Sequence, residues 1–328
     1  MERNRSLDIG KGIAIILVVL GHTYSFSEGN VILNWIEAFH MPFFFVVSGI
    51  LYGGRSSKVQ DFSLKFGNKV KTMLVPYFAW EIPFLLYLFL AKQLADGLTI
   101  DYAVRKSIAV MNLSGLHSTW FLPSLLGVQI LFAALTRMGK LPCIIGAVCL
   151  VVIGLLYPNP ENYLPVVIRC FVALGFFSAG FFGSKWWRRE RNPIIAVLAA
   201  IGYCLLANYN GFVNLVSCTF SNPLLYVVNA LLGIFALLQL SMRLCNVGKI
   251  GVALEYLGRN SIIVLCTHAF IIEFVRLVDY KVLHNVLPRL GYFEGLLFTA
   301  LIIIAEIPVM IFGRRFFPVL FGLKKKDS

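Results

Sequence analysis

The feature that most constrains this chain is a succession of apolar runs, each long enough to cross a membrane. A helix that spans the hydrocarbon core of a bilayer needs about 20 apolar residues. Backbone N–H and C=O groups must be satisfied internally in lipid, so such runs form helices. The sequence therefore predicts an all-α, polytopic transmembrane helical bundle of about ten spans. The expected spans are 7–26, 32–52, 73–92, 118–137, 141–157, 165–183, 193–208, 223–242, 258–277 and 293–312.

Composition supports an integral membrane protein and excludes a soluble one. Hydrophobic residues make up 59% of the chain and charged residues only 14%, against about 25% charged in ordinary soluble domains. The net charge of +13 is typical of nucleic-acid binding proteins, but no soluble domain remains to carry that function. Most of the Lys and Arg residues fall on the inner side if both termini are cytoplasmic, which predicts that orientation. We expect a single integral-membrane domain over 1–328, with the first span retained because no small-residue cleavage site follows it.

Several kinds of catalytic motif are missing from the sequence. The seven cysteines are scattered singly without metal-ligand spacing, so we expect no metal site. A glycine-rich phosphate loop, a serine elbow and paired catalytic carboxylates are also missing. Ser48 and Gly49 are interpreted as helix-packing residues rather than as catalytic ones.

The first span carries ionisable residues, which are costly in a bilayer and persist mainly at functional sites. Lys11 and His22 lie eleven residues apart, about three helical turns and roughly 16 Å of rise, so they share a face. Asp8 lies one turn before Lys11 on the same stripe. The stripe therefore leads from one membrane surface toward the other. A neutral imidazole at His22 has the chemistry of a general base.

Two further histidines lie in apolar runs. His40 precedes Pro42, and a proline early in a span removes a backbone hydrogen bond. Positioning of His22, contact with an acceptor and bracing of the helix at the proline all remain open roles for His40. His268 lies in the middle of the ninth span, either as a further functional residue or as a structural one.

These residues resemble the opening of a known family. The resemblance rests on Arg5, Asp8, Lys11 and Gly12, on His22, on the run from His40 to Phe45, and on Ser48-Gly49. Weaker similarities follow in the expected order at Val75-Pro76-Tyr77, at Trp120-Phe121-Leu122 and at Leu257 to Ser261 before His268. The chain is similar to the membrane-bound acyltransferase-3 family, particularly its fucose-acetylase-like bacterial O-acetyltransferases.

The resemblance implies a function and a site. Members of the family take acetyl groups from cytoplasmic acetyl-CoA and transfer them to sugar hydroxyls of envelope or lipid-linked glycans at the plasma membrane. It implies His22 as the catalytic base, with His40 and His268 as further catalytic or acceptor-positioning candidates. The residues expected to bind the donor are Arg5, Asp8, Lys11, Lys69 and Lys71.

Two alternative functions remain open from the sequence. The same intramembrane charges are compatible with a transporter or flippase for a glycan or organic anion. A sensory or scaffolding membrane protein is a third interpretation. The second half of the chain has no counterpart of the Lys11 to His22 stripe, and the absence of such a repeat disfavours a transporter.

Overall fold

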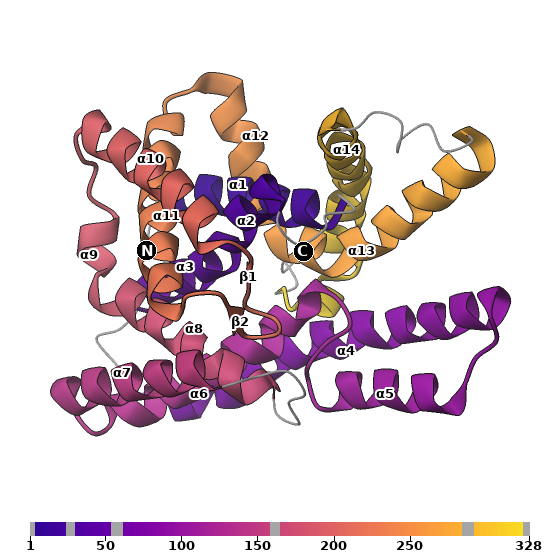
Figure 1. Cartoon of the computed structure of the whole chain (residues 1–328), viewed down its shortest axis with the longest axis horizontal. Coiled ribbons are helices and arrows are strands. Elements are labelled where there is room, and N and C mark those ends of the chain that lie inside the picture. Colours follow the sequence, from indigo (N-terminus) through magenta and orange to yellow (C-terminus); the bar gives the residue numbers. More distant parts are fainter. Residues whose placement is uncertain (1–3, 24–29, 54–61, 158–164, 284–291, 324–328) are drawn as a thin grey trace. The chain divides into compact units, whose positions relative to one another are not determined.

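Helices make up almost all of the structure, a computed structural model that describes residues 4–23, 30–53, 62–157, 165–283 and 292–323 (Figure 1). The helices are α1 (Arg5–Thr23), α2 (Val31–Glu37), α3 (His40–Gly53), α4 (Phe62–Ala95), α5 (Ile100–Met111), α6 (Phe121–Thr136), α7 (Lys140–Leu156), α8 (Pro165–Phe182), α9 (Ser184–Trp187), α10 (Pro193–Asn210), α11 (Pro223–Leu244), α12 (Gly248–Arg259), α13 (Ser261–Val278) and α14 (Tyr292–Phe316). One short antiparallel pair, β1 (Val213–Asn214) and β2 (Thr219–Phe220), joins α10 to α11.

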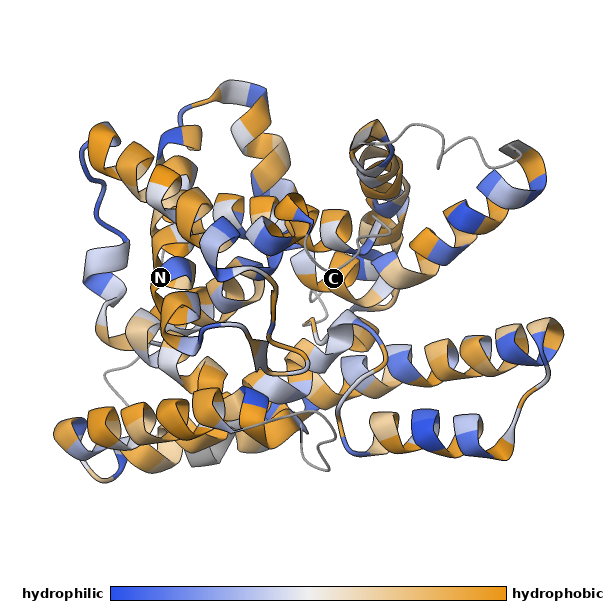
Figure 2. Cartoon of the chain, in the orientation of Figure 1, coloured by the Kyte–Doolittle hydropathy of each residue, from blue (hydrophilic) through white to orange (hydrophobic). Residues whose placement is uncertain are grey.

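The helices confirm a polytopic membrane bundle. Within the described residues, nine helical segments are long and apolar enough to cross a bilayer. The fifth expected span, 141–157, corresponds to α7, which is apolar but only 17 residues long. Hydrophobic residues run along most of the length of these helices, whereas the amphipathic α5 carries hydrophilic patches (Figure 2). The chain is therefore a multi-pass membrane protein.

Two helix breaks refine the predicted spans. The second span is divided into α2 and α3, because Pro42 has no N–H with which to continue the backbone ladder at that point. The ninth predicted span begins at Ser261 rather than at 258, because a separate helix, α12, ends at Arg259. That amphipathic helix was not among the predicted elements.

The described helices group into two compact units. Unit 1 comprises Met1–Gln60, Val128–Asn162 and Ile168–Ser261, and unit 2 comprises Asp61–Gly127, Tyr163–Val167 and Ile262–Ser328. The prediction of one domain over the whole chain stays a prediction.

Unit 1 is held together by close helix contacts at glycines. A Cβ on Gly12 would overlap the Leu254 carbonyl oxygen of α12, and one on Gly258 would overlap the Asp8 carbonyl oxygen of α1. Gly49 of α3 makes a similar approach to α8, which confirms the packing interpretation of that residue. Small residues let membrane helices approach closely enough for backbone contact. Helix α1 is thereby fixed against α12, with α3 and α11 also beside it.

Unit 2 is organised around buried polar groups. The Tyr77 hydroxyl of α4 donates to the Val110 carbonyl oxygen of α5 at 2.9 Å. The Thr267 hydroxyl of α13 lies 2.8 and 2.9 Å from the two carboxyl oxygens of Glu306 on α14. Each of these contacts joins two helices within the unit, because a buried polar group without a partner is costly.

Candidate functional site

A cluster of charged side chains occupies the beginning of α1. The Lys11 ammonium group lies 2.6 Å from a carboxyl oxygen of Asp8, one turn earlier on the same helix. The other oxygen of Asp8 lies 3.7 Å from Nε of Arg259, at the end of α12. Asp8 is buried, and two cations compensate its charge. Asp8 and Lys11, which the sequence places one turn apart on one stripe, thus form an ion pair.

Helix α12 contributes a second carboxylate to this cluster. Glu255 accepts a hydrogen bond from Nε of Arg5 at 2.9 Å and pairs with Arg259 through its other oxygen. Nη1 of Arg5 donates at 2.8 Å to the carbonyl oxygen of Cys245, the residue that follows α11. Arg5 therefore joins α1 to α12 and caps the end of α11.

The cluster carries a surplus of positive charge. Three cations, Arg5, Lys11 and Arg259, face two carboxylates. The Arg5 and Arg259 side chains are 41% and 42% exposed, whereas Asp8 is almost fully buried. Guanidinium and ammonium groups in this arrangement have the chemistry to bind phosphate oxygens. We call these five residues, Arg5, Asp8, Lys11, Glu255 and Arg259, the α1–α12 charge cluster.

His22 lies at the opposite end of α1, where its side chain is exposed. Its Nδ1 is 2.8 Å from the carbonyl oxygen of Val18, one turn earlier. A carbonyl oxygen only accepts, so Nδ1 carries the proton and the lone pair is on Nε2. This is the tautomer in which Nε2 can take a proton.

His40 begins α3 and is buried. Its Nδ1–H donates to the Ile36 carbonyl oxygen at 2.7 Å, across the break between α2 and α3. The ring thus braces the helix where Pro42 interrupts it. His22 and His40 are close enough to interact electrostatically, and Gly21 packs against Ile36. The two imidazoles therefore lie near one another.

The face of α1 between Lys11 and His22 is closed in this structure. Ile15 and Val18 lie on that face, and both side chains are almost completely buried. An acyl group moving from the α1–α12 charge cluster to His22 over this face would have to displace their packing.

Comparison with known proteins assigns the chain to a family. The model of the acyltransferase-3 family, described as an acyltransferase domain, matches residues 4–310. The chain belongs to the acyltransferase-3 family. No curated protein and no solved structure gives a match. This protein is therefore a multi-pass membrane acyltransferase, and both ends of α1 lie within the matched region.

The third histidine of this acyltransferase has a different environment. His268 lies in unit 2 and is fully buried. Its Nδ1–H donates to the Val264 carbonyl oxygen at 2.7 Å, and its Nε2 lies 3.2 Å from the Ser118 hydroxyl. Both ring nitrogens are thus engaged, which fits a structural role. A catalytic or acceptor-positioning role for His268 stays a prediction.

The remaining predicted donor residues belong to unit 2. Lys69 and Lys71 lie near the beginning of α4, while the α1–α12 charge cluster lies in unit 1. Their role as phosphate ligands stays a prediction. In the described parts of the chain, no three His, Cys, Asp or Glu side chains are grouped as a metal site requires.

Sequence reasoning missed three ionisable residues at these sites. Glu255 and Arg259 reach the cluster because glycine contacts bring α12 onto α1, and no spacing in the sequence predicts that contact. Glu37 lies one turn before His40 and is only partly exposed. A carboxylate inside an apolar run is itself a functional signal, so Glu37 was detectable from the sequence.

Proposed function

We propose that this protein is a membrane-bound O-acetyltransferase with His22 as its general base. It takes an acetyl group from cytoplasmic acetyl-CoA and transfers it to a hydroxyl of an envelope or lipid-linked glycan. The proposed location is the plasma membrane of a bacterium, with both termini cytoplasmic, and the proposed subtype is fucose-acetylase-like. The observation that carries the proposal is the exposed imidazole of His22 at the end of α1, whose Nδ1–H donates to the Val18 carbonyl oxygen.

That hydrogen bond supports base catalysis because it assigns the lone pair of His22 to Nε2. In the proposed reaction the acceptor hydroxyl oxygen attacks the thioester carbonyl carbon while its proton moves to Nε2. The tetrahedral intermediate then collapses, the C–S bond breaks, and the departing thiolate takes the proton from the imidazolium. The products are an acetyl ester and free coenzyme A, and His22 returns to its neutral form.

The α1–α12 charge cluster supports the proposed site for the donor. Acetyl-CoA carries several phosphates, and Lys11 and Arg259 supply positive charge close to a partly exposed surface. Arg5 contributes a further guanidinium, although two of its nitrogens already hold protein groups. Asp8 orients Lys11 and Arg259 rather than contacting the donor in this proposal.

His40 supports His22 rather than replacing it. Its Nδ1–H is used to brace the break before α3, and its ring is buried beside His22. We assign to His40 the positioning of His22.

The decisive experiment measures release of free thiol from acetyl-CoA by purified protein, with and without envelope sugars. The wild type is expected to release thiol with sugar present, and His22→Ala should abolish this while the protein remains monodisperse in size-exclusion chromatography. His40→Ala should reduce the rate without abolishing it. Sugar or anion transport by reconstituted protein without thiol release would overturn the proposal in favour of a transporter or flippase.

A further inference from the structure

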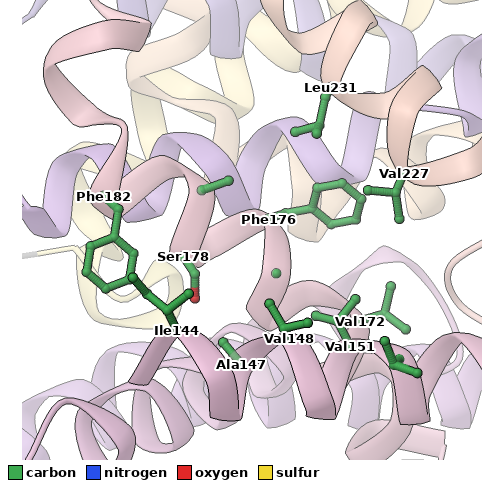
Figure 3. A pocket seen from close by; sticks show the side chains of 13 residues that line it. Ile144, Ala147, Val148, Val151, Val172, Phe176, Ser178, Phe182, Val227 and Leu231 are labelled. Carbon is green, nitrogen blue, oxygen red and sulfur yellow. The ribbon is translucent and has the colours of Figure 1, made fainter. Parts of the chain in front are cut away.

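Apolar cavities lie in both units, and they differ in the charges beside them. In unit 1 a groove of about 380 Å³ lies between α7, α8 and α11, and its lining is apolar except for Ser178 (Figure 3). In unit 2 a cavity of about 450 Å³ lies between α4, the end of α14 and η5 (Pro318–Phe321), a single turn that follows α14. Basic residues border the second cavity, and their chemistry indicates a ligand.

The turn η5 forms one wall of this cavity because it folds back onto α4. Trp80 Nε1 of α4 donates to the Leu320 carbonyl oxygen at 3.0 Å, and its indole stacks on the Phe321 ring with the ring centroids 5.1 Å apart. Gly322 follows η5 with φ of 63°, and a Cβ there would overlap the Thr72 carbonyl oxygen. These contacts hold η5 along α4 from Thr72 to Trp80.

The lining of the cavity suits a hydrocarbon chain. Its side chains are aliphatic or aromatic, and the one polar group among them, the Trp80 N–H, is engaged by η5. Phe312 and Phe317 line the cavity and are each 58% exposed. Phe312 and Trp80 lie in segments long and apolar enough to cross a bilayer, so the open side of the cavity faces lipid.

Basic side chains border one end of the cavity. Lys71 is exposed and directly precedes Thr72, the residue that the backbone after η5 approaches. Arg315 is exposed and lies one turn after Phe312 of the lining. Its guanidinium carbon lies 5.4 Å from the centre of the Phe316 ring. The two cations therefore flank η5, one on each helix that the turn contacts.

The charge of this end is positive overall. The stretches 62–80 and 307–323 contain three Lys, two Arg and no Asp or Glu. The carboxyl group before the second stretch is that of Glu306, which accepts from the Thr267 hydroxyl and lies about 13 Å of helical rise from Arg315. Clustered Lys and Arg residues at a membrane surface attract anionic lipids, and guanidinium groups bind phosphate oxygens.

We infer that unit 2 binds an anionic phospholipid, with an acyl chain in the cavity beside Trp80 and Phe312 and the phosphate at Lys71 and Arg315. The spacing fits such a molecule: Lys71 lies nine residues before Trp80, about 13 Å of rise, and one leaflet supplies about 15 Å of hydrocarbon. The site is independent of acetyl transfer, and it assigns Lys71 to a lipid phosphate rather than to the donor.

The test uses the full-length protein in phosphatidylcholine nanodiscs that contain a trace of phosphatidylglycerol with a diazirine in one acyl chain. After illumination, peptide mass spectrometry locates the labelled residues. Peptides that contain Trp80 or residues 308–321 should be labelled about fivefold more by this probe than by phosphatidylcholine with the same diazirine chain. The peptide around Leu205, a 66% exposed residue of α10, should be labelled equally by both probes. Equal labelling of the cavity peptides would overturn the inference.

One variant fills the cavity without changing a charge. Val309→Trp places an indole among the lining side chains and should reduce cavity labelling about fivefold, since the acyl chain loses its space. Ile304→Trp is the matched control, because Ile304 is 61% exposed on the same helix and does not line the cavity. Cavity labelling that Val309→Trp leaves intact would overturn the placement of the chain.

A second variant removes the proposed phosphate ligands and does not depend on core packing. Lys71→Gln combined with Arg315→Gln should reduce labelling by phosphatidylglycerol to that by phosphatidylcholine. Arg137→Gln combined with Lys140→Gln is the matched control, since it removes one exposed Arg and one exposed Lys from unit 1. A preference for phosphatidylglycerol that survives the first pair of changes would overturn the head-group assignment.

Saturating acetyl-CoA separates the two sources of phosphate. Labelling of the cavity peptides should be unchanged by acetyl-CoA, because the proposed donor site is the α1–α12 charge cluster of unit 1. Loss of this labelling on addition of acetyl-CoA would assign the cations to the donor and overturn the phospholipid site. Labelling does not depend on catalysis, so its outcome is distinct from that of the thiol-release experiment.

Discussion

Two histidines of this protein each make the same kind of local hydrogen bond, but the side chains and solvent around the two rings differ. His22 in unit 1 and His268 in unit 2 each donate Nδ1–H to the carbonyl oxygen four residues earlier. His268 is fully buried and its Nε2 meets the Ser118 hydroxyl, whereas His22 is exposed at a helix end beside His40. In both residues the hydrogen bond to the helix backbone fixes the proton on Nδ1. The surroundings of Nε2 then determine whether the imidazole has a catalytic or a structural role.

The two regions also differ in how they hold charge. In unit 1, Asp8 and Glu255 are paired with Lys11, Arg5 and Arg259, and both arginines are partly exposed. In unit 2, Glu306 is fully buried and accepts from the neutral hydroxyl of Thr267. A partly exposed cluster with surplus cations suits an anionic ligand, whereas a buried carboxyl satisfied by a hydroxyl joins helices.

The largest expected effect is the difference between replacing His22 and replacing His268. His22→Gln keeps a polar side chain but has no basic nitrogen, so the rate of acetyl transfer should fall about 10²- to 10⁴-fold. His268→Gln should instead lower the melting temperature while the rate per folded molecule stays within a few-fold of wild type. Thiol release and thermal unfolding in detergent measure the two effects. The assignment would be wrong if His268→Gln abolished turnover in protein that remained folded.

The next effect tests the contact that assembles the α1–α12 charge cluster. Gly258→Val would force α12 away from the Asp8 backbone, and overpacking of this kind costs about 1–3 kcal/mol. We expect lower thermal stability together with a higher KM for the donor. Gly67→Val is the matched control, because a Cβ at Gly67 meets no atom within 4 Å. An unchanged donor KM in the Gly258 variant would contradict the role of this contact.

A smaller effect concerns Lys11 itself. Lys11→Ala removes one cation near the proposed phosphates, so the donor KM should rise about tenfold, equivalent to about 1.4 kcal/mol, with kcat changed much less. Lys140→Ala, at an exposed lysine that begins α7, provides the comparison. If kcat fell while KM stayed constant, Lys11 would act in the chemical step and not in donor binding.

The smallest effect is expected in unit 2. Thr267→Val removes the hydroxyl that donates to Glu306 and should destabilise the protein by about 1–2 kcal/mol. Thr267→Ser keeps the hydroxyl and should stay close to wild type. Thermal unfolding measures the difference, and donor KM should be unaffected by either change. A shift in donor KM would show that the Glu306 region is coupled to the donor site.

Hydropathy predicted much of the fold because it is a local property of the sequence. Most of the apolar runs became helices close to their expected bounds, and Pro42 marked the place where the second span divides. The third run is an exception, because α4 begins at Phe62 rather than at 73. Helix α12 was missed because its apolar positions are too few and too spaced to form a spanning run. The stripe of Asp8, Lys11 and His22 was also predictable, since helical periodicity alone places those residues on one face.

The remaining parts of the site depend on contacts between distant segments. Sequence reasoning found Lys11 but not Glu255 and Arg259, because only the packing of α12 against α1 brings them to Asp8. It found His22, His40 and His268 as candidates but gave no means of ranking their burial. The groove between α7, α8 and α11 likewise has no signature in any single run, since every apolar helix there resembles its neighbours.

The sequence by itself determined that this chain crosses a membrane as a series of helices and that ionisable residues line one face of the first. Those properties follow from the cost of polar groups in lipid and from the helical repeat. Only the tertiary structure decided which cations surround Asp8, which of the histidines are buried, and where a groove opens. Such facts depend on how closely helices approach, and that distance is set by side-chain packing across the whole fold.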